Sequence, residues 1–161
     1  MKVYIKNKLI SLGGSSTVVN EQEQPVFTVK GKIVSPTKKK FLLDMEGNTL
    51  YKIRNRFWNM FAYKTFIYDA DGNRVATIKK GKFSFSGKFE IEDSVDSMSI
   101  DGKVFSSTSK VMRNNEPVAT ILRDFTIISD AFTLEANEED LPFMVALVIA
   151  FDNLKDEMQD D

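Results

Sequence analysis

The chain has 161 residues, of which 42% are hydrophobic and 28% charged, so one globular domain is expected over residues 1–161. It contains no histidine and no cysteine, which excludes disulfide bonds, thiolate nucleophiles, histidine-based triads, and zinc or haem sites built from those residues. Metal chemistry with all-oxygen ligands is left open.

The net charge of −1 conceals a division of charge along the chain. Residues 1–88 carry 17 Lys and Arg against 6 Asp and Glu, whereas residues 89–161 carry 5 against 17. A basic half can hold phosphate groups, lipid head groups or nucleic acid, and an acidic half can screen it or maintain solubility.

The N-terminal residues show no targeting or phosphate-binding motif. Residues 1–6 lack the continuous apolar stretch of a signal peptide or anchor, so a cytoplasmic location is expected. Gly13–Ser16 is rich in glycine but lacks the lysine and spacing of a phosphate-binding loop. We interpret it as a flexible turn.

Short β-prone runs and turn sequences follow each other from residue 26 to residue 134. The turn sequences are Met45–Asn48, Asp69–Asn73, Asp101–Gly102 and Asn114–Pro117. The alternation of phenylalanine with polar residues in Lys82–Ser86 is typical of a half-buried antiparallel strand. Strands are predicted at Val26–Val34, Phe41–Asp44, Leu50–Ile53, Thr65–Tyr68, Val75–Ile78, Phe83–Ile91, Met98–Ile100, Val104–Phe105, Val118–Leu122, Phe125–Ile128 and Phe132–Leu134.

Two of these hairpins share a repeat without gaps. Asp44–Arg54 (DMEGNTLYKIR) aligns with Asp69–Lys79 (DADGNRVATIK), and the segment VATI of Val75–Ile78 recurs at Val118–Ile121. The irregular spacing of the copies argues against a solenoid or a propeller and favours a meandering sheet. A sheet of about ten or more strands in one small domain has to curl or close into a barrel.

The segment Leu141–Phe151 is different, because it has no polar side chain. Acidic residues precede it and Pro142 is tolerated in a first turn, so a helix is predicted over about residues 139–157, with a short acidic tail at 158–161. The segment is apolar on every face but shorter than the ~20 residues that span a bilayer. We therefore predict a barrel that surrounds its own C-terminal helix.

The two hairpins at 44–54 and 69–79, the later VATI copy and the apolar helix at 141–151 resemble the LURP-one-related family, including its bacterial members, over nearly the whole chain. The resemblance implies the tubby C-terminal-like fold, which is also attributed to phospholipid scramblases. This fold is mainly β: a closed antiparallel β-barrel of about twelve strands around a central hydrophobic C-terminal helix. The matching residues belong to the scaffold, and the resemblance supplies no catalytic motif.

Basic residues form the first candidate site. Residues i and i+2 of a strand share a face, so basic-x-basic pairs would place two cations together on an outer wall suited to phosphates. The alternative is a solvated barrel face, on which lysines prevent edge pairing. The candidates are the pairs Lys30 and Lys32, Arg54 and Arg56, and Lys80 and Lys82, together with the cluster Lys38, Lys39 and Lys40.

The aromatic run Arg56–Tyr63 (RFWNMFAY) is the second candidate. As an exposed loop beside arginines, it would insert at a membrane interface or hold an apolar ligand. The alternative, which is commoner for such runs, is that these aromatic side chains fill the barrel.

Acidic residues provide no catalytic or metal-binding pattern. Asp69 and Asp71 lack the spacing and terminal glutamate of an EF-hand and are interpreted as turn residues. Glu138–Asp140 favour the start of the helix, and the acidic residues at 156–161 are read as a solvated end. No cofactor, no metal site and no enzymatic activity are expected.

Three functional hypotheses remain. The favoured one is a non-catalytic binding module whose basic outer wall holds anionic lipid head groups or another phosphate-bearing ligand at a membrane surface. The alternative is a protein interaction or regulatory scaffold, which an exposed apolar patch would favour. An enzyme built on carboxylates would require a pocket containing a carboxylate of raised pKa. Nucleic acid is not expected as a partner, and no transmembrane segment is predicted.

Overall fold

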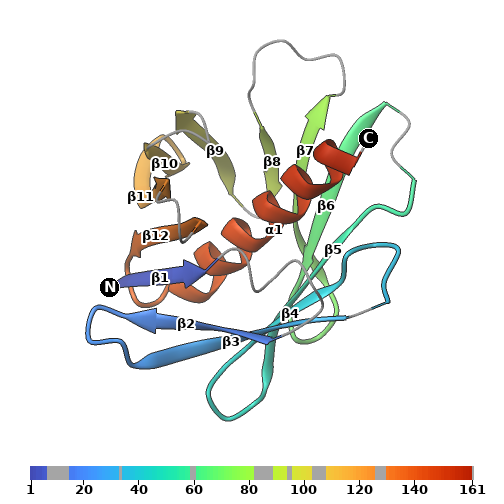
Figure 1. The fold of residues 1–161 in the computed structure, drawn as a ribbon. Helices are drawn as coiled ribbons and strands as arrows, with labels where there is room; N and C mark the ends of the chain where they lie inside the picture. Colours follow the sequence, from blue (N-terminus) through green and yellow to red (C-terminus); the bar gives the residue numbers. More distant parts are fainter. Residues whose placement is uncertain are drawn as a thin grey trace.

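A barrel of antiparallel strands surrounds a single helix in the computed structural model (Figure 1), which describes residues 1–6, 15–32, 34–58, 61–81, 89–93, 96–102, 108–125 and 130–160. The strands are β1 (Lys2–Lys6), β2 (Ser15–Asn20), β3 (Pro25–Gly31), β4 (Lys40–Leu43), β5 (Thr49–Asn55), β6 (Ala62–Tyr68), β7 (Arg74–Gly81), β8 (Glu90–Asp93), β9 (Ser97–Gly102), β10 (Thr108–Arg113), β11 (Glu116–Phe125) and β12 (Asp130–Ala136), and the helix is α1 (Leu141–Asp160).

Each strand pairs with its neighbours in sequence, and the sheet closes where β1 lies between β12 and β2. Closure leaves no strand edge unpaired, which removes the usual risk of edge-to-edge aggregation. The predicted closed antiparallel barrel around a C-terminal helix is therefore confirmed.

Several strand predictions differ from the structure. Strands β1, β2 and β10 were not among the predicted runs. Strand β11 contains the predicted run Val118–Leu122 and continues without a break to Phe125, the first residue of the next predicted strand. The interpretation of Gly13–Ser16 as a turn is wrong at its end, because Ser15 begins β2 and Ser16 is buried. The turn predicted at Asp101–Gly102 is also wrong, because both residues belong to β9 and pair with β10. Residues 82–88, 103–107 and 126–129, to which other strand predictions extended, lie outside the described residues.

An aspartate and a glycine form the turn of each repeated hairpin, as predicted. In the first copy, Oδ1 of Asp44 accepts the backbone N–H groups of Glu46 at 3.0 Å and Asn48 at 2.8 Å, and Gly47 has a φ of +90°. The side-chain amide of Asn48 also donates to Asp44 and lowers the pKa of that carboxyl group. The φ value favours glycine because a Cβ atom is strained in this region.

Helix α1 runs through the inside of the barrel (Figure 1), and its residues Met144–Leu154 are buried. This agrees with a segment that is apolar on every face. The helix begins at Leu141 and continues to Asp160, so residues 158–160 of the predicted acidic tail belong to its last turn, and Asp161 lies outside the described residues. Asp140, just before it, accepts a hydrogen bond from the Arg113 guanidinium at 2.7 Å. In the described part of the chain, no helix is long and apolar enough to cross a membrane.

Candidate functional site

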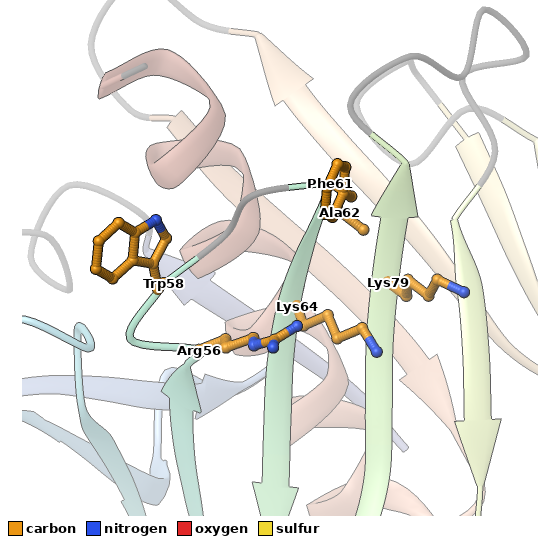
Figure 2. A pocket seen from close by; sticks show the side chains of 6 residues that line it. All are labelled: Arg56, Trp58, Phe61, Ala62, Lys64 and Lys79. Carbon is orange, nitrogen blue, oxygen red and sulfur yellow. The ribbon is translucent and has the colours of Figure 1, made fainter.

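A hollow of about 530 Å³ opens where β5 ends and β6 begins. Figure 2 shows the side chains that line it: Arg56, Trp58, Phe61, Ala62, Lys64 and Lys79. The lining combines three cationic side chains with two aromatic rings, and none of these six residues carries a carboxylate. The hollow can therefore hold an anionic group together with an apolar one.

The aromatic side chains of this loop are exposed. Phe57, Trp58 and Phe61 are 71%, 72% and 75% accessible to solvent, whereas Tyr63 is buried in the barrel. Of the two interpretations of this run, the one in which its aromatic side chains fill the barrel is therefore wrong for Phe57, Trp58 and Phe61 and correct for Tyr63. The physical reason is that only Tyr63 occupies an inward position of a strand, while the other three rings lie in the connection between β5 and β6.

Asn55 fixes the base of this loop from inside the barrel. This last residue of β5 is fully buried, and its side-chain amide donates to the Asn153 carbonyl at 3.1 Å and to the Glu157 carboxylate at 3.0 Å. Its Oδ1 accepts a hydrogen bond from the Thr65 hydroxyl at 2.7 Å. Because adjacent residues of an extended chain point to opposite faces, the inward position of Asn55 directs Arg56 outward.

Three basic residues from neighbouring chain segments form a cation row: Arg56, Lys64 and Lys79. The Arg56 N–H donates to the Lys64 carbonyl at 2.8 Å, and Lys64 lies directly opposite Lys79 in the pairing of β6 with β7. In Figure 2 the Lys79 side chain extends toward β8, where its Nζ lies 3.5 Å from Oε2 of Glu90. The row therefore crosses the sheet from the end of β5 through β6 to β7, and the Glu90 carboxylate of β8 lies next to its last member, Lys79.

The basic surface continues along β5–β7 beyond the hollow. The Lys52 ammonium lies 4.8 Å from the centre of the Tyr68 ring, and the Arg54 and Arg74 guanidinium groups each lie 5.4 Å from the centre of the Phe66 ring. Arg54 also donates to the Tyr68 hydroxyl at 2.8 Å. Among the described residues, no carboxylate forms an ion pair with these three cations. Their aromatic contacts hold the charges in place without neutralising them.

Lys30 and Lys32 are exposed, but they are separate from the cation row. Lys30 pairs with Phe41 of β4, which in turn pairs with Lys52 of β5. Two strands therefore separate Lys30 from β6, which carries Lys64. Arg54 and Arg56, which were predicted as a pair on the outer face, do lie there, and only Arg56 reaches the hollow.

Lys38, Lys39 and Lys40 do not form one surface cluster. Lys40 is an inward residue of β4, and its Nζ lies 3.4 Å from Oδ2 of Asp152 on α1, with both side chains buried. The placement of Lys40 on the outer wall is therefore wrong. Lys38 is half-buried, its Nζ 4.0 Å from the Glu157 carboxylate, and Lys39 is half-buried as well.

Lys80 also faces the inside of the sheet rather than the outer wall. It shares the inward face of β7 with Ile78, and its Nζ lies 5.1 Å from the centre of the Phe89 ring. The predicted pair of Lys80 and Lys82 was shifted by one residue relative to the other copies, and a shift of one residue exchanges the two faces of a strand. Lys82 lies outside the described residues.

The basic-x-basic pattern missed Lys64 and Lys79, although the repeat contains a signal for one of them. The alignment of Asp44–Arg54 with Asp69–Lys79 places Lys79 at the position of Arg54, which faces outward. Lys64 stands between Tyr63 and Thr65, both buried, and the alternation of a strand directs it outward.

The pKa values of the buried pair Lys40 and Asp152 are both shifted. Burial lowers the pKa of Lys40 and raises the pKa of Asp152, and the attraction between the two partners opposes both shifts. Asp152 lies on the central helix and does not line the hollow. In the described part of the chain, no group of three acidic side chains is placed to hold a metal ion.

Comparisons with known proteins give the family. The family model described as LURP-one-related matches residues 1–152. The X-ray structure of a protein from Arabidopsis thaliana resembles this one with a TM-score of 0.63 at 16% identity, over 96% of this chain and 91% of that chain. At this identity the likeness shows a shared fold. No curated protein matches the sequence. The chain belongs to the LURP-one-related family.

Proposed function

We propose that the protein is a non-catalytic binding module that attaches to membrane surfaces containing anionic phospholipids. One observation carries the proposal: the exposed side chains of Trp58 and Phe61 line a single hollow together with the cation row, and the exposed Phe57 precedes Trp58 in the same loop. Aromatic rings partition into the interface between head groups and acyl chains, while neighbouring Lys and Arg attract anionic head groups. The arrangement supplies both interactions at one place.

The distribution of charge around the barrel supports one orientation toward such a surface. In a ring of the observed strand order, β12 lies opposite β6. Glu135 of β12 is exposed, as are Glu138 and Glu139 that follow it, whereas the wall at β5–β7 carries Lys52, Arg54 and Arg74 in addition to the cation row. An anionic surface attracts the basic wall and repels the acidic one, so the aromatic loop faces the lipid.

Co-sedimentation with vesicles tests the proposal. Binding is expected to vesicles of phosphatidylcholine with phosphatidylglycerol, to weaken with added salt, and to be absent with phosphatidylcholine alone. The variant Arg56→Gln/Lys64→Gln/Lys79→Gln is expected to bind about a hundredfold more weakly, because each basic residue near the surface contributes about fivefold. Absence of wild-type binding to the anionic vesicles at low salt would refute the proposal.

A matched pair of apolar variants isolates the role of the aromatic rings. Trp58→Ser is expected to weaken vesicle binding about tenfold, because a large apolar side chain no longer enters the interface. Met45→Ser removes another exposed apolar side chain, at the turn before β5, and is expected to leave binding unchanged. Equal binding by the two variants would show that the loop does not contact the lipid.

The same exposed rings favour a second candidate function, the docking of an acidic protein. Phe57, Trp58 and Phe61 are large exposed apolar side chains in one loop, and exposed apolar side chains gathered in this way are typical of interaction sites. A photoreactive residue at position 58 would then cross-link to a protein partner, and Arg56→Gln would weaken the cross-link. Cross-linking to phospholipid instead, with no protein partner, would favour the membrane proposal.

A further inference from the structure

The cation row brings three positive charges within reach of one small anion. Arg56 bonds through its backbone to Lys64, and Lys64 pairs with Lys79 on the next strand. Neighbouring strands lie about 4.8 Å apart, so the three side chains begin within about 10 Å of each other. Long, flexible side chains at these spacings can converge on one phosphate group, with the rings of Trp58 and Phe61 beside it.

One carboxylate balances part of this charge. Glu90 of β8 lies opposite Lys79 in the register, with 3.5 Å between Lys79 Nζ and Glu90 Oε2. The Glu90 side chain is 68% exposed and that of Lys79 is 34% exposed, so water and salt weaken this ion pair. A ligand with more charge than one carboxylate can therefore displace Glu90 from Lys79. Arg56, Lys64, Lys79 and Glu90 together carry a net charge of +2.

A ligand group with two negative charges and three free oxygens matches both the net charge of these four residues and the number of cationic donors. A phosphomonoester has both properties near neutral pH, whereas a phosphodiester carries one charge and two free oxygens. The guanidinium of Arg56 can donate two parallel hydrogen bonds to such a group, and each lysine can donate to an oxygen as a point charge. The apolar walls of the hollow are suited to the organic part of the same molecule.

We propose that the cation row selects a terminal phosphomonoester over a phosphodiester, and that this ligand displaces Glu90 from Lys79. This inference rests on the proposed function and deepens it by naming the chemical class of the head group. The source of the phosphomonoester is either a membrane lipid or a soluble amphiphile, which the experiments separate.

Two sets of vesicles provide the main test. Phosphatidic acid presents a phosphomonoester and phosphatidylglycerol a phosphodiester, and their mole fractions in phosphatidylcholine are adjusted to equal surface potential. At pH 7.5, binding to phosphatidic acid is expected to be about fivefold tighter. Equal affinity for the two vesicles overturns the inference and leaves the proposed function intact. Absence of binding to both overturns the proposed function.

The pH dependence gives an independent readout. The second ionisation of a phosphomonoester lies near pH 6, so its charge falls when the pH is lowered from 7.5 to 5.5. The chain has no histidine or cysteine, the side chains that ordinarily titrate in this interval. The preference for phosphatidic acid is therefore expected to disappear at pH 5.5. A preference of the same size at both pH values contradicts recognition of the dianion.

Variants on β8 test the displaced carboxylate. Glu90→Gln is expected to tighten binding to phosphatidic acid about fivefold, because Lys79 no longer has a competing partner. Glu92→Gln is the matched control: it lies two residues further on the same face of β8, is exposed, and pairs with Thr77 rather than with Lys79. Equal affinities of the two variants overturn the role of Glu90.

A soluble probe identifies the source of the ligand. Octyl phosphate and octyl sulfate differ in charge near neutral pH but share one alkyl chain, and their binding can be measured by calorimetry. Binding of octyl phosphate but not of octyl sulfate, weakened by Lys64→Gln/Lys79→Gln, supports the inference and shows that the cation row recognises the phosphomonoester of a soluble amphiphile as well as that of a lipid. Binding of both probes with equal affinity overturns it.

Discussion

Lys64 and Lys79 lie directly opposite each other on β6 and β7, and both side chains line the hollow on the outer face. Like charges at directly opposed positions of a sheet repel each other and destabilise the pairing. Repulsion between the two lysines is therefore expected at the place where an anionic ligand would neutralise it. Unfavourable interactions of this kind are typical of binding sites.

A double-mutant cycle measures this repulsion. Lys64→Gln, Lys79→Gln and the double variant are compared by urea denaturation, which isolates the interaction between the two residues from their other contacts. The coupling is expected to be repulsive by about 0.2–1 kcal/mol and to shrink at high salt. An attractive coupling, or one that salt leaves unchanged, contradicts the proximity of the two charges.

The buried pair of Lys40 and Asp152 predicts an asymmetric response to substitution. Asp152→Asn leaves the Lys40 ammonium buried without its partner and is expected to lower the free energy of unfolding by about 3–5 kcal/mol. The double variant Lys40→Met/Asp152→Leu removes both charges and is expected to be as stable as the wild type or more stable by about 1–4 kcal/mol. Chemical denaturation checks both. Similar losses in the two variants would show that the ion pair itself stabilises the barrel.

The same pair predicts a pH dependence of defined sign. In Lys40→Met, burial and the charge of Asp156 raise the pKa of Asp152, and Lys155 opposes them less than Lys40 does in the wild type. The unfolded chain releases this proton near the ordinary value of 3.8. The folded state then holds one more proton than the unfolded state. The stability of Lys40→Met is therefore expected to fall as the pH rises from about 4, by up to ~1.4 kcal/mol per pH unit, until Asp152 ionises.

The apolar double variant is the control for this titration. Lys40→Met/Asp152→Leu lacks the carboxyl group, so the difference in its free energy of unfolding from that of Lys40→Met is expected to grow between pH 4 and pH 7. Urea denaturation at several pH values measures the difference. A constant difference would show that Asp152 ionises equally in the folded and unfolded states.

The fold could be predicted because its determinants are local. A hairpin turn is predicted at Asp44 and again at its copy, Asp69, and a buried helix is predicted at Leu141–Phe151. A closed barrel around a helix is the arrangement consistent with all three. The strands β1, β2 and β10 were missed because their short segments carry weaker patterns than the repeated hairpins. Pairing with neighbouring strands stabilises them in the barrel.

The site was harder to predict because it depends on which face each residue occupies. Lys40 is adjacent to Lys39 in sequence, but the barrel interior contains Asp152, which lies 112 residues further along the chain. Lys79 rather than Lys80 faces outward, a distinction of one residue that only the strand register fixes. The exposure of Trp58 depends on where β5 ends, and the buried network around Asn55 determines that position.

Two double variants of equal charge change distinguish the hollow from the wider basic surface. Lys64→Gln/Lys79→Gln is expected to weaken binding to phosphatidylglycerol vesicles about twenty-five-fold, because both side chains lie beside the aromatic loop. Lys30→Gln/Lys32→Gln removes two exposed charges near β3 and is expected to have a several-fold smaller effect. Co-sedimentation measures both. Equal losses would mean that the net charge of the protein, rather than the hollow, determines binding.

The fluorescence of Trp58 tests the central proposal most directly, because Trp58 is the single tryptophan of the chain and is 72% exposed at the hollow. Titration with phosphatidylglycerol-containing vesicles is expected to shift its emission to shorter wavelength, and lipids brominated on the acyl chains are expected to quench it. Phosphatidylcholine vesicles are expected to cause neither change. Unchanged emission in samples whose co-sedimentation shows bound protein would contradict attachment through the aromatic loop.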